Sequence, residues 1–137
     1  MLHNWRKFGQ YGVHLPKLPF APTWVSSSQA NLSRREKFFT ATFVNKASGD
    51  FLIFYVDNTG RPVSISNYSI NVGLSRARGV YSRLGGLQAL QWRYGRYLCS
   101  LQVARGFKWN YAEKYLMEAK RYLTIPQLIS IANSTMK

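Results

Sequence analysis

The residues of this 137-residue sequence that are best suited to bind a ligand are its arginines. No Asp or Glu occurs between Asp57 and Glu113, whereas the same stretch contains eight cations. They are Arg61, Arg76, Arg78, Arg83, Arg93, Arg96, Arg105 and Lys108. Protein surfaces ordinarily mix both signs of charge, so this long run of one sign indicates a polyanionic partner. Because guanidinium groups bond phosphate oxygens in pairs and stack on bases, the excess of arginine favours a nucleic acid.

Two short segments place these arginines beside glycine, at residues 75–79 and 83–86. Glycine lets backbone amides approach a phosphate closely, and a helix that starts there would add its dipole. Neither segment matches a P-loop or a dinucleotide-binding fingerprint. They are therefore interpreted as phosphate contacts and not as a nucleotide site.

Aromatic residues make up 15% of the chain and are interleaved with the cations. Unpaired RNA bases commonly stack on aromatic rings and guanidinium planes. Most of these rings are expected in the core. Residues 107–111 follow a glycine and are the best exposed candidates, so Lys108 and Trp109 join the predicted binding residues.

The sequence offers few groups that could catalyse a reaction. Glu113 and Glu118 would lie about 140° apart on a helix, so no paired carboxylates are evident for acid–base or two-metal chemistry. Cys99 lies on an apolar strip, where an inert core thiol is expected. Both histidines fall near the N-terminus, away from the other metal-ligating residues. We therefore expect no enzyme, no cofactor, no metal site and no small-molecule substrate.

Composition places further limits on the class of protein. Nineteen Lys and Arg face five Asp and Glu, and the formal charge of +14 makes the chain repel itself unless a polyanion supplies counter-charge. No apolar run approaches the roughly 18 residues of a transmembrane helix, so we expect a protein that does not span a membrane. Cys99 is the one cysteine, which excludes an internal disulfide and fits a reducing compartment. The N-terminus lacks the apolar core of a secretory signal.

Residues 1–37 are expected to form an extended basic arm. They contain five aromatic residues in the first 24 positions and show no sustained helical or alternating period. Because disordered tails are usually poor in aromatic residues, we expect the arm to become ordered against a partner. Its cations Arg6, Lys7, Arg34 and Arg35 are candidate nucleic-acid contacts.

Residues 38–137 are expected to form one small α+β domain. Residues 38–44 and 51–56 are rich in β-branched and aromatic side chains, and a turn-forming segment separates them, which predicts a β-hairpin. Residues 63–72 would supply a third strand after a turn at residues 57–60. The expected sheet is a three-stranded antiparallel meander.

Two to four helices are expected to pack on this sheet. Residues 76–84 predict a short helix, which the glycines at 85 and 86 would break. Residues 87–104 carry apolar side chains at i, i+3, i+7, i+11 and i+14, which predicts a long amphipathic helix. Arg93 and Arg96 would then form a ridge on its solvent face.

The last part of the chain predicts two further helices. Asn110 and Glu113 resemble a capping box, which would open a helix that runs through residue 123. Thr124 and Pro126 predict a last short helix. Its apolar side would consist of Leu128, Ile129 and Ala132.

A basic arm on a small α+β core without catalytic groups is typical of a structural subunit in a ribonucleoprotein particle. The sequence therefore predicts a non-catalytic RNA-binding protein, and a ribosomal protein that contacts rRNA phosphates and neighbouring proteins fits best. Much Tyr and Trp with modest Lys favours the matrix of a mitochondrion or another organelle over the cytoplasm. Two alternatives remain open, a viral or phage nucleic-acid-binding protein and a peripheral subunit of a membrane-bound complex.

Overall fold

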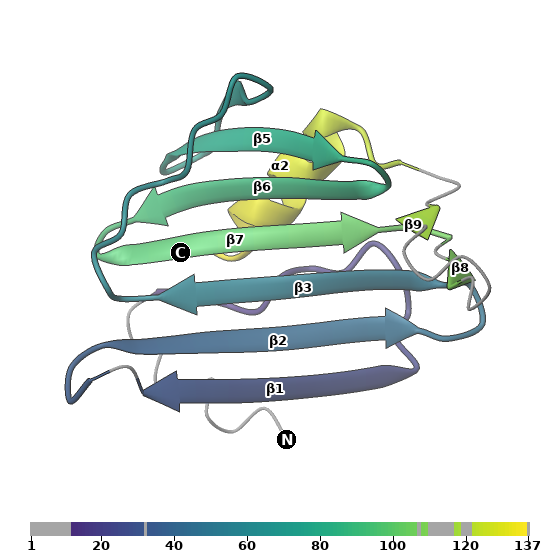
Figure 1. Cartoon of the computed structure of the whole chain (residues 1–137), viewed down its shortest axis with the longest axis horizontal. Helices are drawn as coiled ribbons and strands as arrows, with labels where there is room; N and C mark the ends of the chain where they lie inside the picture. Colours follow the sequence, from purple (N-terminus) through teal and green to yellow (C-terminus); the bar gives the residue numbers. More distant parts are fainter. Residues whose placement is uncertain (1–11, 32, 107, 110–116, 119–121, 137) are drawn as a thin grey trace.

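The computed structural model describes residues 12–31, 33–106, 108–109, 117–118 and 122–136. Their main feature is a seven-stranded antiparallel sheet with the strand order β1-β2-β3-β7-β6-β5-β4 (Figure 1). The strands are β1 (Trp24–Asn31), β2 (Lys37–Asn45), β3 (Asp50–Asp57), β4 (Ile70–Gly73), β5 (Arg78–Leu84), β6 (Leu87–Tyr94) and β7 (Tyr97–Ala104). A separate two-stranded pair consists of β8 (Lys108–Trp109) and β9 (Met117–Glu118).

One face of the sheet holds the core, because buried side chains alternate with half-buried ones along its central strands. On β2 the buried residues are Phe39, Ala41 and Phe43, and on β3 they are every second residue from Leu52. Alternation of this kind turns one set of side chains to each face. The buried set joins residues of β6 and β7, including Trp92, in one cluster.

Helix α2 (Ile125–Ser134) covers this core face and lies behind the sheet in Figure 1. Its start is fixed by a capping box, in which the Thr124 hydroxyl accepts from the Gln127 amide while the Gln127 side chain accepts from the Thr124 amide. Leu128, Ile131 and Ala132 are buried against the sheet. The opposite face, called the outer face below, carries half-buried side chains such as Thr40 and Tyr55.

The predicted fold, a three-stranded meander with two to four helices, was wrong. Residues 78–84 form β5 and residues 87–104 form β6 and β7, and two-residue hairpin loops join these strands. Gly85 and Gly95 open these loops with φ of +57° and +60°, as glycine does at the first loop position of a type II′ turn. The apolar residues of 87–104 match a helical spacing only because the loop at Gly95 shifts the alternation between two strands.

The N-terminal arm of the predicted fold was also wrong for the residues that the structure describes. Trp24–Asn31 forms the strand β1, which pairs along its whole length with β2. Val13 is buried in the core and forms an isolated bridge with Met136. Val13 therefore belongs to the core, and Trp24–Asn31 belongs to the seven-stranded sheet.

Other expected elements agree or disagree with the structure individually. The first two predicted strands correspond to β2 and β3, and the last predicted helix corresponds to α2, with Ile131 buried and Ile129 half-buried. Of the predicted strand at residues 63–72, only its end belongs to β4. Most of the helix expected after Asn110 lies outside the described residues, and Met117–Glu118 within it is a strand.

Membrane insertion through a helix is not supported. Within the described residues, no helix is long and apolar enough to cross a bilayer.

Candidate nucleic-acid interface

The arginines of the central sequence gather at one end of the sheet because of its topology. In an antiparallel sheet, alternate connections lie at the same end. The β1–β2 turn, the exit from β3, the β4–β5 turn and the β6–β7 turn share one end, at the left of Figure 1. We call this the basic end and define it by Arg34, Arg35, Lys37, Arg61, Arg76, Arg78, Arg93 and Arg96.

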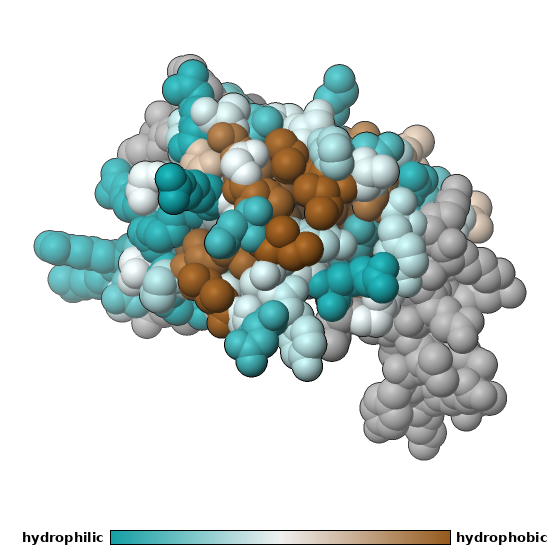
Figure 2. Space-filling view, turned by 90° about the horizontal axis from the view of Figure 1, so that it is seen from above, coloured by the Kyte–Doolittle hydropathy of each residue, from teal (hydrophilic) through white to brown (hydrophobic). Residues whose placement is uncertain are grey.

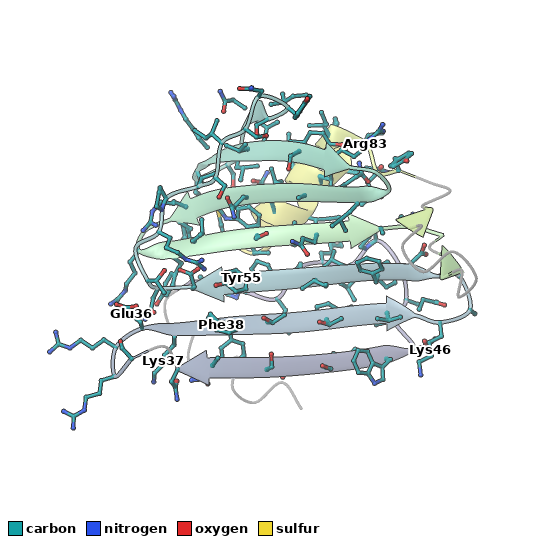
Figure 3. All side chains as sticks on the ribbon, in the orientation of Figure 1. Glu36, Lys37, Phe38, Lys46, Tyr55 and Arg83 are labelled. Carbon is teal, nitrogen blue, oxygen red and sulfur yellow. The ribbon has the colours of Figure 1, made fainter. Side chains whose placement is uncertain are left out.

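The charge at the basic end is strongly positive. Eight cations share it with two acids, Glu36 and Asp57, so the local balance is 8 − 2 = +6. Seven strands at about 4.8 Å spacing make the row of turns about 29 Å long. Figure 3 shows Glu36 and Lys37 at this end and Lys46 and Arg83 at the other. The basic end is therefore a long, narrow strip and not a compact pocket.

The β1–β2 turn holds its two arginines outward on an ordered backbone. The Ser33 hydroxyl accepts hydrogen bonds from the amides of Arg35 (3.4 Å) and Glu36 (3.1 Å), and the Ser33 amide donates to the Glu36 carbonyl. Serine commonly closes a turn through such bonds to its own backbone. The side chains of Arg34 and Arg35 remain exposed to solvent.

Asp57 is fully buried at the end of β3, and its carboxylate holds the turn that follows. Its carboxylate accepts from the Arg61 guanidinium at 2.7 Å and from the Tyr55 hydroxyl at 2.9 Å. It also accepts from the amide of Thr59 at 3.0 Å and from its hydroxyl at 2.8 Å. A buried carboxylate is stable only when its oxygens are satisfied in this way. Asp57 therefore neutralises one arginine of the basic end and fixes the backbone that carries it.

These contacts shift the pKa values of Asp57 and Tyr55. Burial raises the pKa of Asp57, but the hydrogen bonds from Arg61 and Thr59 outweigh it, so the net pKa is lowered from its usual value. Burial and the adjacent Asp57 carboxylate raise the pKa of Tyr55. Asp57 is therefore ionised at neutral pH.

The connection from β3 to β4 crosses the outer face beside the basic end. The Ser64 amide donates to the Gln91 side chain at 2.7 Å, and the Arg93 guanidinium donates to the carbonyl of Arg61. Arg96, in the next turn, lies over the ring of Tyr97, with 5.8 Å between the guanidinium carbon and the ring centroid. Both arginines are thus attached to the scaffold at the same end.

An aromatic pair lies on the outer face next to these cations. The rings of Phe38 and Tyr55 come from adjacent strands and have their centroids 5.7 Å apart (Figure 3). Both side chains are half-buried, so part of each ring is open to solvent. Exposed rings on a sheet can stack with unpaired bases. Phe38 and Tyr55 are therefore the aromatic residues best placed to assist the basic end.

Half of the predicted site residues meet at the basic end. They are Arg34, Arg35, Arg76, Arg78, Arg93 and Arg96. Arg93 and Arg96 do not form a helical ridge, because they belong to the β6–β7 hairpin. Arg78 and Gly79 lie in β5, so no helix begins at residues 75–79.

The other predicted site residues lie away from the basic end or outside the residues that the structure describes. Arg83 is at the opposite end, with its guanidinium carbon 4.5 Å from the ring centroid of Tyr122. Arg105 donates to buried Asp50 at 3.1 Å. The backbone of Lys108 and Trp109 forms the strand β8. Arg6 and Lys7 fall outside the described residues.

Two residues of the basic end, Lys37 and Arg61, were not grouped with its other cations from the sequence. Lys37 was assigned to the arm, and Arg61 was counted among the central cations without a place in the fold. Two-residue loops of Gly-Gly and Gly-Arg between apolar runs are hairpin signals. With those hairpins recognised, alternate turns would have been assigned to one end.

The structure adds nothing in favour of catalysis at Cys99. This thiol is 1% exposed, and burial raises its pKa to about 12, so it is almost entirely protonated at neutral pH. Among the described residues, no group of three His, Cys, Asp or Glu could hold a metal ion.

Comparison of this chain with protein-family models, curated proteins and solved structures found no match.

Proposed function

We propose that this protein binds RNA through the basic end and acts as a non-catalytic subunit of a ribonucleoprotein particle. The single observation that carries the proposal is the gathering of eight cations on four turns at one end of the sheet. Asp57 pairs with one of them, and Glu36 is the other acid at this end. Such a strip would attract the phosphate backbone without regard to sequence.

The geometry favours a single-stranded or looped RNA. The strip of turns is about 29 Å long and narrow, which suits a strand that runs across the sheet end. Arginines at successive turns would contact successive phosphates, while Phe38 and Tyr55 would stack with unpaired bases on the adjoining face. Contacts of this kind give affinity through charge and stacking, and they give little base specificity.

The identity of the particle is a finer part of the proposal. A ribosomal subunit of a mitochondrion or another organelle fits the charge and aromatic content best, and the cytoplasm is the second location. The charge at the basic end would equally suit a viral or phage nucleic-acid-binding protein. A peripheral subunit of a membrane-bound complex would turn the same end toward anionic lipid.

Fluorescence polarisation with a labelled 20-nucleotide single-stranded RNA tests the proposal. The double variant Arg34→Gln with Arg76→Gln removes two exposed cations from opposite ends of the strip. At 100 mM salt we expect its Kd to rise about tenfold, because two phosphate contacts are lost.

The matched control removes the same charge from the other end of the sheet. Lys46→Gln with Arg83→Gln also replaces two exposed cations, which Figure 3 shows away from the basic end. We expect its Kd to stay within about twofold of the unaltered protein. Equal weakening of both variants, or no measurable binding by the unaltered protein, would contradict the proposal.

A further inference from the structure

A groove of about 650 Å³ opens on the outer face between the edge of the sheet and the β3–β4 connection. Its floor is formed by β4 and β5, with Asn71 and Val80, whose side chains share the outer face, among its lining residues. Its wall is the connection itself, with Val63 and Ile65. The volume is in the range of small-molecule sites, and such sites are mostly apolar with a few polar groups.

The wall of the groove is held in place by hydrogen bonds. The Ser64 amide donates to the side chain of Gln91 on β6. The segment then closes on itself, because the Ser69 amide donates to the carbonyl of Ser66 at 3.1 Å and the Ser66 amide donates to the Ser69 hydroxyl at 2.9 Å. The groove is thus formed by paired backbone on both sides.

Two arginines on neighbouring strands line this groove. The register that pairs Gly79 with Trp92 brings Arg78 beside Arg93 at the next position of the ladder, and both line the groove. Like charges that face each other across two strands destabilise a sheet. The two ion pairs among the described residues involve Arg61 and Arg105, so no described acid pairs with either groove arginine. An anion bound between them would relieve this repulsion.

Apolar side chains are also exposed on the β4 side of the molecule. Figure 2, which views the molecule from this side, shows hydrophobic residues gathered in one patch. Ile65, at the groove wall, is 78% exposed, whereas Ile70 on β4 is 51% exposed and lies on the core face, in register with Tyr81 and Leu90. Ile65 therefore adds exposed apolar surface to the groove.

We propose that the groove binds a small amphipathic acid, with an aliphatic tail along Val63, Ile65 and Val80 and its carboxylate between Arg78 and Arg93. Charge complementarity fixes the orientation, because Arg78 and Arg93 are the charged residues of the lining and Asn71 is its one other polar side chain. Aliphatic lining residues favour an alkyl tail over a nucleobase, which would be expected to stack on aromatic rings. The site uses Arg78 and Arg93, which also belong to the basic end, but binding of the acid does not require RNA binding.

Isothermal titration with dodecanoate, below its micellar concentration, tests the site on the full chain, with 1-dodecanol and dodecylamine as matched probes. We expect saturable binding of dodecanoate at one site, binding of dodecanol at least tenfold weaker, and no binding of dodecylamine. Equal affinity for the three probes would overturn the assignment of the carboxylate to the arginine pair.

Filling the groove provides the decisive variant. A Cβ at Gly73 would meet no atom within 4 Å and its φ is not positive, so Gly73→Leu places a side chain at the groove without strain in the backbone. We expect Gly73→Leu to weaken dodecanoate binding at least tenfold and to change the Kd for RNA by less than about twofold, because it removes no cation of the basic end. Unchanged dodecanoate affinity, with the circular dichroism spectrum of the unaltered protein, would overturn the proposal.

Two further measurements keep the proposal testable if Gly73→Leu does not fold. Ile65→Asp adds a carboxylate at an exposed wall position and should weaken dodecanoate at least fivefold. Vesicles of phosphatidylglycerol distinguish a free acid from a lipid surface. The proposal would be overturned in favour of a membrane contact if the protein sediments with the vesicles, loses this sedimentation in either variant, and yet does not bind free dodecanoate.

Discussion

The side chain of Gln88 clasps the backbone of Leu123 with two hydrogen bonds. Its Nε2 donates to the Leu123 carbonyl at 2.8 Å, and its Oε1 accepts from the Leu123 amide at 2.9 Å. Gln88 is 3% exposed and lies on β6, whereas Leu123 directly precedes the cap of α2. The clasp therefore fixes where the helix begins against the core face of the sheet.

Replacing Gln88 with Leu should destabilise the protein. Two buried backbone groups of Leu123 would lose their partners, at about 1 to 3 kcal/mol each, so we expect a loss of about 2 to 6 kcal/mol in the free energy of unfolding. Urea denaturation measures the loss. Gln102→Leu, at an exposed position of the outer face, is the control and should change stability by less than about 0.5 kcal/mol. Equal effects of the two variants would show that the clasp contributes nothing.

Substitution at Gly95 tests the hairpin that replaced the predicted long helix. Gly95 has φ +60° and open space around its α-carbon, so Gly95→Ala should cost about 1 to 2 kcal/mol through backbone strain alone. Gly73→Ala is the matched control, because it also enters open space but at a φ that is not positive. Thermal unfolding should show Gly73→Ala to be neutral or slightly stabilising. A stabilising Gly95→Ala would instead favour a helix there.

The sequence predicted the two strands that are rich in β-branched and aromatic residues and the helix that begins after Thr124. These strands are β2 and β3, and Thr124 with Pro126 marked the start of α2. The central region misled the prediction because Leu90, Leu98 and Leu101 satisfy a helical spacing by coincidence. In the sheet, Leu90 and Leu101 are cross-strand partners. The sequence fits both a helical period and a strand period here, and the pairing of the strands in the fold decides between them.

The candidate site could be predicted in composition but not in arrangement. Acid-free sequence and abundant arginine are visible in the chain itself. The union of Arg34 with Arg76 at one sheet end depends on strand order, because β1 and β4 are opposite edges of the sheet. Nor does the sequence show that Asp57 neutralises Arg61, since this requires the buried turn after β3.

Acid should destabilise the protein through its two buried aspartates. The pKa of Asp57 and of Asp50 is lowered in the folded state, so each carboxylate binds a proton less readily than in the unfolded chain. Their contribution is complete above the unfolded pKa of about 4 and is lost as the pH falls through the lower folded value. We expect the urea midpoint to be flat from pH 7 to about 5 and to decline below about 4. Asp57→Asn should make that decline shallower, and an unchanged decline would exclude Asp57 as a cause.

Cys99 should resist thiol reagents in the folded protein. With a pKa of about 12 and 1% exposure, only about one thiol in ten thousand is ionised at pH 8, and reagent cannot reach it. Incubation with Ellman's reagent should give no colour within minutes, and one equivalent should react after denaturation in guanidinium. Rapid reaction without denaturant would place this side chain outside the core.

The dependence of RNA binding on salt should count the phosphates that the basic end contacts. About four to six neutralised phosphates on a single strand predict a slope of about −3 to −4 for log K against log salt. Arg34→Gln with Arg76→Gln should reduce the magnitude of the slope by about 1.4, because each lost contact removes about 0.7. A slope near zero for the unaltered protein would mean that binding does not depend on phosphate charge.

The order of the strands also has a consequence for how the chain folds. The strands β1 to β3 and β4 to β7 are two consecutive meanders, and the pairing of β3 with β7 joins them through partners such as Asp57 and Leu98. Each meander forms from neighbours in sequence, whereas the seam closes a loop of about forty residues and comes at a higher entropic cost. The seam should therefore form last and limit the folding rate. Two fragments separated in the 58–69 connection would then reassemble by docking β3 against β7.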